Sequence, residues 1–368
     1  MALLEVSNLG IAFGGLQAVS QLDLKIEKGH LYGLIGPNGA GKTTVFNMLT
    51  GVYKPTEGNI VLDGNDITGA TPEAISKAGI ARTFQNIRLF NDMTVLDNVK
   101  VGLHNQVVYG MWTGILRLPS FREKEHEMDR RAMKLLKIFD LDAEANYKAS
   151  QLPYGKQRKL EIARALATNP KLLLLDEPFS ALDSYLKWDL ELKLSDFLEN
   201  FSGPILWVSH DRGEVFRNCK RVCILDQGAS QGTFTLRQLF HEPETEAAAR
   251  LSGCKNIVEA VPAGSAVTLP AWGLTLNCGK PVPADVRQAG IRARHVMTVP
   301  EGTPDAFYCT VERVIQDVFT TIVLLRPEGA ADGAPLLRME LERDDWRRLN
   351  RPEGLWIAIQ PRDILLLK

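Results

Sequence analysis

Two adjacent carboxylates, Asp176 and Glu177, follow a run of four leucines in the segment LLLLDEPFSALD (172–183). A buried carboxylate without a partner is costly, so such a pair normally has a cation to bind or a proton to move. The alternative is a strand that ends at the surface in a solvated turn closed by Pro178. This segment alone leaves both interpretations open.

A glycine-rich segment, GPNGAGKTT (36–44), fits the phosphate-loop pattern G-x-x-x-x-G-K-[ST]. Backbone N–H groups of such a loop point at a phosphate, and the helix that follows adds its dipole. The glycines that allow this are Gly36, Gly39 and Gly41. Lys42 supplies a cation for the β- and γ-phosphate oxygens, and the Thr43 hydroxyl can ligate Mg²⁺. A purely structural glycine-rich turn is the less favoured alternative.

The phosphate loop gives the two carboxylates a role. In phosphate-loop ATPases a second apolar strand ends beside the loop, and its carboxylate holds Mg²⁺. We expect Asp176 in that position. Glu177 follows it and is expected to polarise the attacking water as a general base, which typically contributes about 10² to 10⁴ in rate.

Two further polar residues lie where they could join this set. Gln85, in RTFQNIRLF, carries an amide that can orient water and contact Mg²⁺. His210 ends the predicted strand ILWVSHD, where an imidazole could reach the γ-phosphate. Either residue taken alone is more often structural, so their assignment depends on the rest of the set.

The segment LPYGKQRKLEIARALA (152–167) predicts an amphipathic helix that Gly155 opens, and its bare N-terminus suits an anion. It is far in sequence from the phosphate loop. One chain therefore has two anion sites, and a second chain could bring this helix to the nucleotide of the first. The alternative is an ordinary surface helix with a proline at its start.

The elements that position these residues alternate between strand and helix. We expect strands at 31–36, 171–176, 204–209 and 221–226, and helices at 42–51, 121–141, 156–168 and 184–200. Residues 1–50 alternate between short apolar strands and turns. This order predicts an α/β phosphate-loop domain over 1–240, with a mainly parallel sheet covered on both faces and a helical subdomain at about 86–160.

The composition changes near residue 241, where Pro and Gly become frequent and short alternating runs appear. These runs are IRARHVMTV, TTIVLLRP, PLLRMELE, LWIAIQP and ILLLK. They predict a small β-barrel-like or sandwich domain over 241–368. None of the predicted chemistry lies there, so we expect this domain to be regulatory or to add to a dimer contact.

The bulk composition is ordinary for a soluble globular protein, with 368 residues, 45% hydrophobic and 24% charged. A net charge of −1 excludes the basic field of nucleic-acid binders. No apolar run reaches the length of a membrane span, and the start MALLEVSNLG is not expected to be a signal peptide. The five cysteines are expected to be thiols of a cytoplasmic protein, with a metal role for Cys219 and Cys223 as a minor alternative.

Taken together, residues 4–240 resemble the ATP-binding subunits of ABC transporters. The resemblance implies a role for each motif: Phe13 stacking on adenine, Walker A at 36–44 with Asn38 and Thr44 among its nucleotide-binding residues, the Q-loop at Gln85, the signature at 152–158, Walker B at 172–177, the D-loop at 180–183 and the switch histidine at His210. It implies ATP and Mg²⁺ as cofactors.

The signature segment departs from the family pattern. The usual sequence is L-S-G-G-Q, whereas this chain has Leu152, Pro153, Tyr154, Gly155 and Lys156. The serine hydroxyl that would donate to the γ-phosphate is missing. Gly155 and the helix N-terminus remain, so the resemblance still places Tyr154 and Gly155 at the nucleotide of a second chain.

Two parts of the chain resemble different importers. Residues 1–178 resemble branched-chain amino-acid ATPases, in segments such as ARTFQNIRLFNDMTVLDNVKVGLH. Residues 177–368 resemble the molybdate type, in segments such as GPILWVSHDRGEVFRNCKRVCILDQG and in a TOBE-like tail. A natural fusion, an engineered chimera and a generated sequence all stay open.

The resemblance implies a peripheral protein at the cytoplasmic face of the membrane. Its partners would be permease subunits, a second ATP-binding subunit in a homodimer or heterodimer, and indirectly a substrate-binding protein. Hydrophobic amino acids are the expected cargo, because docking would use Gln85 to about Tyr147, within the branched-chain-like part. Molybdate is the alternative cargo. A soluble ABC-type ATPase and a nucleotide-binding regulator are alternatives of other classes.

An apolar cluster in the expected docking region predicts an interface, with ordinary core as its equal alternative. The cluster consists of Val107, Val108, Tyr109, Met111, Trp112, Ile115 and Leu116.

Overall fold

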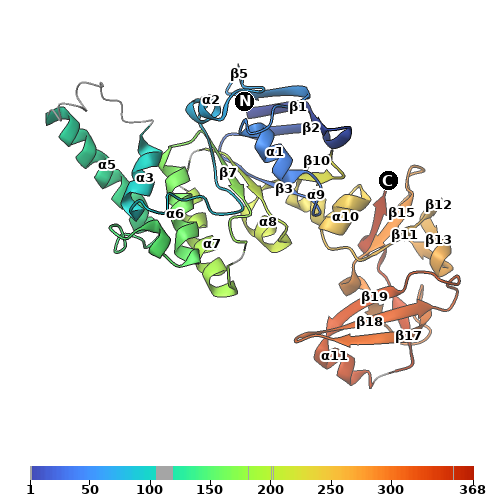
Figure 1. Cartoon of the computed structure of the whole chain (residues 1–368). Coiled ribbons are helices and arrows are strands. Elements are labelled where there is room, and N and C mark those ends of the chain that lie inside the picture. The colour runs from blue at the N-terminus through green and yellow to red at the C-terminus, as the bar shows by residue number, and fades with distance from the viewer. Residues whose placement is uncertain (1, 105–118, 181, 200, 202, 351) are drawn as a thin grey trace. The chain divides into compact units, whose positions relative to one another are not determined.

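The computed structural model describes residues 2–104, 119–180, 182–199, 201, 203–350 and 352–368. The apolar cluster predicted at 107–116 lies outside these residues. The chain divides into two compact units, Met1–Phe234 and Thr235–Lys368 (Figure 1). The sequence placed this boundary a few residues later, after residue 240. Within the described ranges, no helix is both long and apolar enough to cross a bilayer.

The first unit is built on a ten-stranded mixed sheet, in the order β5-β4-β1-β2-β10-β9-β3-β8-β7-β6. In chain order its strands are β1 (Ala2–Phe13), β2 (Leu16–Glu27), β3 (Leu31–Ile35), β4 (Glu57–Leu62), β5 (Asn65–Asp66), β6 (Ile80–Arg82), β7 (Leu172–Asp176), β8 (Ile205–Val208), β9 (Arg221–Asp226) and β10 (Ala229–Thr235). The expected strands near 31, 171, 204 and 221 are therefore present.

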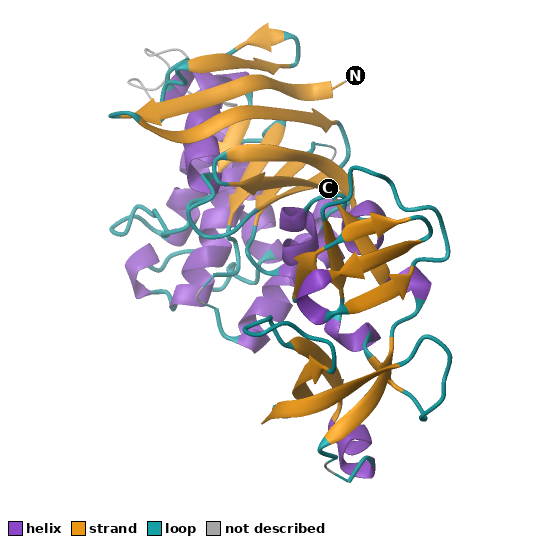
Figure 2. Ribbon diagram, turned by 90° about the vertical axis from the view of Figure 1, so that its right-hand side faces the viewer, coloured by secondary structure: helices purple, strands orange, loops and turns teal. Residues whose placement is uncertain are grey.

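The antiparallel part of this sheet corrects the prediction of short strands in a mainly parallel sheet. β1 and β2 have 12 residues each and pair antiparallel, and they run as long ribbons near the N-terminus in Figure 2. Gly14 and Gly15 join them with positive φ angles of 53° and 90°. Two such residues suit a tight hairpin turn. Because no helix intervenes, the strands cannot run parallel.

The parallel part positions the chemistry. β3 pairs in parallel with β8, β8 with β7, and β7 with β6. β3, β7 and β8 are buried along almost their whole length, as expected of central strands covered on both faces. Because the strands are parallel, their carboxyl ends meet at one edge of the sheet, which we call the carboxyl edge.

The helices of the first unit are α1 (Lys42–Leu49), α2 (Pro72–Ala78), α3 (Val95–Leu103), α5 (Pro119–Ile138), α6 (Tyr154–Ala167), α7 (Ser184–Glu199) and α8 (Arg212–Asn218). The four expected helices correspond to α1, α5, α6 and α7 to within a few residues, whereas α2, α3 and α8 were not predicted individually. α3, α5 and α6 pack against one another and form the helical region (Figure 1). Thr94 caps α3 by accepting the N–H of Asp97 on its hydroxyl oxygen.

The second unit is a small β-barrel-like domain built from antiparallel strands. Its strands are β11 (Asn256–Glu259), β12 (Val261–Ala263), β13 (Ala266–Leu269), β14 (Leu274–Asn277), β15 (Gln288–Ile291), β16 (Met297–Thr298), β17 (Phe307–Gln316), β18 (Thr320–Pro327), β19 (Leu337–Glu342), β20 (Gly354–Ala358) and β21 (Ile364–Leu367). Its helices are α9 (Leu236–His241), α10 (Glu246–Leu251) and α11 (Arg343–Arg348). Trp272 and Trp346 lie in its core.

The segment IRARHVMTV, predicted as one strand, is an exception in this unit. β15 ends at Ile291, a 3₁₀ helix follows at Ala293–His295, and β16 has two residues. Further 3₁₀ helices lie at Ala149–Gln151, Pro270–Trp272 and Pro361–Asp363. The interruption lets the chain leave one sheet, where β15 pairs with β11 and β21, and enter another, where β16 pairs with β20.

Candidate functional site

The phosphate-loop segment connects the end of β3 to α1 through glycines that no other residue can replace without strain. A Cβ on Gly36 would lie 2.1 Å from the carbonyl oxygen of Leu225. Gly39 and Gly41 have φ angles of 82° and 98°, in the left-handed region that favours glycine. Gly41 is the N-cap of α1 and makes no side-chain cap, so the first N–H groups of the helix remain for an anion.

Lys42 is buried and its ammonium group is held by the loop itself. Its Nζ donates to the carbonyl oxygens of Gly36 at 2.8 Å and Pro37 at 2.9 Å. Burial lowers the pKa of Lys42, while the negative charges of Glu177 and Asp176 act to raise it. The phosphate loop and the two carboxylates are thus close enough to influence one another.

The other predicted loop residues differ in exposure. Asn38 and Thr43 are exposed, and Thr44 is half-buried. Thr43 follows Lys42 in the first turn of α1, directly after the loop. These positions allow contact with a nucleotide.

Asp176 ends β7 almost completely buried, with 1% of its surface exposed. Arg82, the last residue of β6, donates from Nη2 to Asp176 Oδ2 at 2.8 Å. Burial raises the pKa of the Asp176 carboxyl, and the hydrogen bond and charge of Arg82 oppose that rise. The sequence analysis missed Arg82, although it stands three residues before Gln85 in the same motif.

Arg82 is itself fixed by α1 and by the segment after β6. Its Nη1 donates to Asn47 Oδ1 at 2.7 Å, and its guanidinium lies 5.0 Å from the centre of the Phe84 ring. Such a cation–aromatic contact is favourable when water is excluded. Arg82 therefore connects the helix behind the phosphate loop to the carboxylate of Asp176.

Glu177 has a backbone conformation that is unusual for a residue with a side chain. Its φ is 44°, in the left-handed region, which costs of order 1–3 kcal/mol. Its N–H donates to the Val208 carbonyl at 3.0 Å, and its own carbonyl accepts from Arg158 Nη2 at 2.7 Å and Ser180 Oγ at 2.9 Å. These bonds hold the strained residue at the carboxyl edge.

Arg158 is completely buried and joins three segments. It donates to the carbonyl oxygens of Phe84, before Gln85, and of Pro178, after Glu177. It also pairs with the buried carboxylate of Glu161 at 2.6 Å. The sequence analysis missed it because one arginine in an amphipathic helix carries no local signal of burial. Gln85 has an exposed side chain, and Arg158 fixes its backbone segment.

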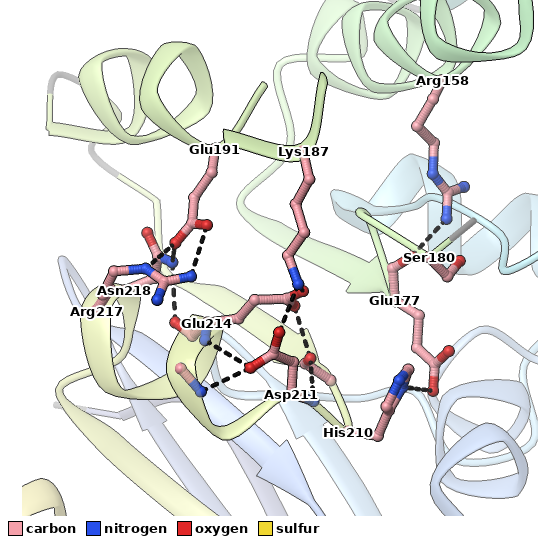
Figure 3. A network of polar contacts seen from close by, with 12 residues as sticks. Arg158, Glu177, Ser180, Lys187, Glu191, His210, Asp211, Glu214, Arg217 and Asn218 are labelled. Carbon is pink, nitrogen blue, oxygen red and sulfur yellow. Dashed lines mark hydrogen bonds and ion pairs between the residues drawn. The ribbon is translucent and has the colours of Figure 1, made fainter. Parts of the chain in front are cut away.

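His210 lies directly beside Glu177. Its Nδ1 is 3.2 Å from Glu177 Oε1, and the contact is drawn in Figure 3. The His210 side chain is 62% exposed, whereas that of Glu177 is 14% exposed. The structure therefore brings together Lys42, the adjacent carboxylates of Asp176 and Glu177, and His210, which come from three separate parts of the sequence.

The signature segment occupies the start of α6. Pro153 is the N-cap and accepts no hydrogen bond on a side chain, so the helix N-terminus is bare as expected. Tyr154 is 42% exposed. A Cβ on Gly155 would lie 3.1 Å from Leu186 Cδ1, so this turn packs on the start of α7.

Phe13 ends β1 and forms an aromatic pair that the sequence analysis did not find. Its ring lies edge-on to Tyr53, with centroids 5.2 Å apart. The two side chains are 44% and 37% exposed. Exposed aromatic rings of this kind offer a face for a planar base.

The oxygen donors of the site suit Mg²⁺, which usually takes one or two protein carboxylates together with phosphate oxygens and water. Asp176 supplies a carboxylate and Thr43 a hydroxyl. Within the described ranges, no group of three or more His, Cys, Asp or Glu residues could hold a metal ion. All five cysteines are free and buried, and burial raises the pKa of Cys223 to about 11. This disfavours a metal role for Cys219 and Cys223.

Comparisons with known proteins show what the chain is similar to. Residues 19–180 match the family model described as ABC transporter. The chain is 40% identical over 242 residues to the high-affinity branched-chain amino acid transport ATP-binding protein LivG of Escherichia coli (strain K12), a match that covers 66% of this chain and 95% of LivG.

Two further matches extend the comparison. The spermidine/putrescine import ATP-binding protein PotA of Oleidesulfovibrio alaskensis is 28% identical over 372 residues, covering 97% of this chain and 94% of PotA. Among solved structures, the dimeric post-hydrolysis state of the ATP-binding cassette MJ0796, bound to ADP and Pi, is similar with a TM-score of 0.55 and 28% identity, over 64% of this chain and 99% of that one.

Proposed function

Since this chain belongs to the ABC transporter family and is an importer-type ATPase subunit whose activity is coupled to transport, we propose that it energises the import of branched-chain or other hydrophobic amino acids. The observation that carries the nucleotide chemistry is the carboxyl edge, where β3, β7 and β8 deliver Lys42, Asp176, Glu177 and His210 to one place. The 40% identity to LivG supports the cargo.

In the proposed reaction each site residue of the chain has a separate role. Lys42 and the amides of the loop bind the phosphates of ATP, and Phe13 with Tyr53 receives the adenine. Asp176 and Thr43, with Gln85, would hold Mg²⁺, which neutralises phosphate charge when bound. Glu177 accepts a proton from the attacking water. His210 contacts the γ-phosphate and, through Nδ1, keeps the Glu177 carboxylate oriented.

A groove of about 540 Å³ in the first unit is the proposed docking place of a permease. It lies between the segment after β6, α2, α3 and α6, close to Gln85 in sequence. Its walls include Phe84, Leu89, Phe90, Val101, Arg82, Arg88 and Arg164. An apolar cytoplasmic segment that carries an acidic group would suit these walls. Docking there would place the chain at the cytoplasmic face of the membrane as a peripheral subunit.

A second ATP-binding subunit would complete the site. The bare N-terminus of α6 at Tyr154 and Gly155 is proposed to meet the γ-phosphate bound by the partner's loop. The similarity to a dimeric cassette supports such pairing. A heterodimer would accord with the branched-chain resemblance and a homodimer with the molybdate resemblance.

A polyamine is the second candidate cargo, because the match to PotA includes the second unit as well as the first. The molybdate and TOBE-like assignment of residues 177–368 rests on the sequence alone and stays a prediction. The predicted domain boundary near residue 240 and the regulatory role of the second unit are proposals of the same kind.

Reconstitution with permease pairs tests the cargo. The full chain is placed in proteoliposomes with a branched-chain-type pair or a polyamine-type pair, each with its binding protein. We expect ATPase stimulation and leucine uptake with the first pair. Glu177→Gln is the matched control, because an amide cannot act as the base. It should bind ATP and lose about 10² to 10⁴ in turnover.

Two results would overturn parts of this proposal. Stimulation and uptake only with the polyamine-type pair would reject the hydrophobic amino-acid cargo and leave the ATPase assignment standing. Turnover of Glu177→Gln near that of the unaltered chain would remove Glu177 from its role as base.

A further inference from the structure

Two segments of the carboxyl edge are connected at two points. One runs from Glu177 into α7, and the other runs from the end of β8 through His210 into α8. The first connection is the contact of His210 Nδ1 with Glu177 Oε1. The second is made by Lys187, which lies in the first turn of α7 and reaches both Asp211 and Glu214 (Figure 3).

The second connection holds both neighbours of His210. Lys187 Nζ lies 2.5 Å from Asp211 Oδ2 and 2.7 Å from Glu214 Oε1. Glu214 Oε2 in turn accepts from the Ser209 hydroxyl at 2.6 Å. Lys187 therefore acts, directly or through Glu214, on the residues before and after His210.

The segment around His210 depends on the same groups for its backbone. Asp211 caps α8, because its Oδ1 accepts the N–H groups of Gly213 at 2.7 Å and Glu214 at 3.4 Å. The N–H of Asp211 donates to Ser209 Oγ at 2.9 Å. Although burial alone would raise it, the hydrogen bonds from Lys187 and from the Gly213 N–H hold the pKa of Asp211 below its ordinary value. Asp211 is thus an anion that Lys187 can hold.

The start of α7 is also held by hydrogen bonds to Asp183. Asp183 caps α7 by accepting the N–H groups of Tyr185 and Leu186 on Oδ1. The N–H of Lys187 donates to the Asp183 carbonyl at 2.9 Å. Lys187 therefore extends from a capped helix end, whereas the His210 side chain is 62% exposed.

We infer that Lys187 is a positioning residue, which holds the His210 segment at the correct distance from Glu177 by binding Asp211 and Glu214. The inference rests on the roles proposed above for Glu177 and His210. Among the described residues the ion pairs of Lys187 are with Asp211 and Glu214, so we assign it no catalytic role of its own. Its loss would let the segment move while the nucleotide-binding loop stays intact.

The same two helices offer a control for simple helix packing. Glu191, one turn further along α7, binds Arg217 of α8 through two hydrogen bonds of 2.7 and 2.8 Å, and accepts from Asn218 Nδ2 at 2.7 Å. This second contact joins α7 to α8 one turn further along α7 (Figure 3). Its connection to the His210 segment is indirect, because Asn218 Nδ2 also donates to the backbone carbonyl oxygen of Glu214 at 2.9 Å. If the packing of α7 on α8 alone determined turnover, substitutions of Glu191 and of Lys187 would lower kcat to the same extent.

The test compares Lys187→Met with Glu191→Gln in the full chain, both checked for folding by circular dichroism. For Lys187→Met we expect kcat to fall about tenfold with KM for ATP within twofold, and Lys187→Arg to restore kcat to within threefold. Amide exchange over 209–214 should be faster in Lys187→Met and unchanged in Glu191→Gln. If Lys187→Met does not fold, Asp211→Asn breaks the same ion pair and keeps the helix cap.

A double-mutant cycle with His210→Ala decides whether Lys187 acts through the histidine. In the His210→Ala background, Lys187→Met should lower kcat less than twofold further. Independent, multiplying losses would reject the inference. A loss of turnover in His210→Ala together with full kcat in Lys187→Met would also reject the inference. The roles proposed for Glu177 and His210 would then still stand. Full kcat in His210→Ala itself would reject the proposed role of His210 and this inference with it.

Discussion

Two ion pairs support the carboxyl edge, and they differ in how far water reaches them. Arg82 and Asp176, on the β6–β7 side, have side chains that are 7% and 2% exposed. Lys187 and Asp211, on the α7–α8 side, are 25% and 38% exposed. Asp176 is itself the predicted Mg²⁺ ligand, and Asp211 adjoins His210. The difference in exposure therefore affects how firmly each of these predicted site residues is held.

Burial determines how much each ion pair contributes to the free energy of unfolding. In the dry pair, loss of one partner leaves a buried charge without compensation, which typically costs 3 to about 5 kcal/mol. In the wetter pair, water screens the attraction, and such pairs contribute up to about 1 kcal/mol. The predicted Mg²⁺ ligand Asp176 is therefore locked in one arrangement, while the segment of His210 can move at small cost.

The largest effect on the free energy of unfolding is expected for the buried pair of Arg82 and Asp176. Arg82→Met should lower the free energy of unfolding by about 3–5 kcal/mol, because Asp176 would stay buried without its cation. Chemical denaturation of the full chain measures this. In Arg82→Met/Asp176→Asn the charge is absent and much of the loss should return. A loss below about 1 kcal/mol in Arg82→Met would show that water reaches Asp176 and that the two pairs are alike.

The contact between Glu191 and Arg217 combines a buried and an exposed environment. Glu191 is 5% exposed and Arg217 is 42% exposed. Arg217→Met should cost about 1.5–3 kcal/mol of unfolding free energy, since Glu191 keeps Asn218 as a donor but loses two charge-assisted hydrogen bonds. Denaturation under the same conditions measures it. A cost equal to that of Arg82→Met would mean that burial of one partner is sufficient for the full effect.

Residues whose role is local could be predicted from the sequence. The phosphate loop needs glycines at fixed spacing beside one lysine, and an apolar strand that ends in Asp176 and Glu177 indicates a bound cation or a proton transfer. The alternation of strand and helix predicted the parallel pairing of the strands that bring these segments together. The hairpin of β1 and β2 was missed because Gly14 and Gly15 were not considered as a two-residue turn.

Residues that act across long separations could not be predicted in the same way. Arg82 pairs with a carboxylate 94 positions away, and Arg158 with a carbonyl 74 positions away. A basic residue in a strand end or an amphipathic helix is usually solvated, and only the fold buries it. Lys187 is only partly buried, but its contacts were also not predicted, because Asp211 and Glu214 follow a different strand. Arg82 and Arg158 lie inside the segments that resemble known ATPases, but the sequence alone does not show which distant groups they bind.

The smallest effect concerns the pH dependence of the wetter pair. Asp211→Asn removes the charge that binds Lys187 but keeps an N-cap side chain for α8, so the difference in unfolding free energy from the unaltered chain isolates the ion pair. The pKa of Asp211 is lowered in the fold from an ordinary value of 3.8, so the unfolded chain binds the proton more tightly. The stabilisation is then fully present above the ordinary pKa and is lost as the pH falls through the lowered value. Since more than a third of the side chain is exposed, screening limits the difference to at most about 1 kcal/mol at pH 7. Urea titrations from pH 7 to below 3.8 should show it shrinking toward zero at the acid end. A difference that persists unchanged in acid would show that the cap, and not the charge, explains the effect, and the pair with Lys187 would then add little to the position of α8.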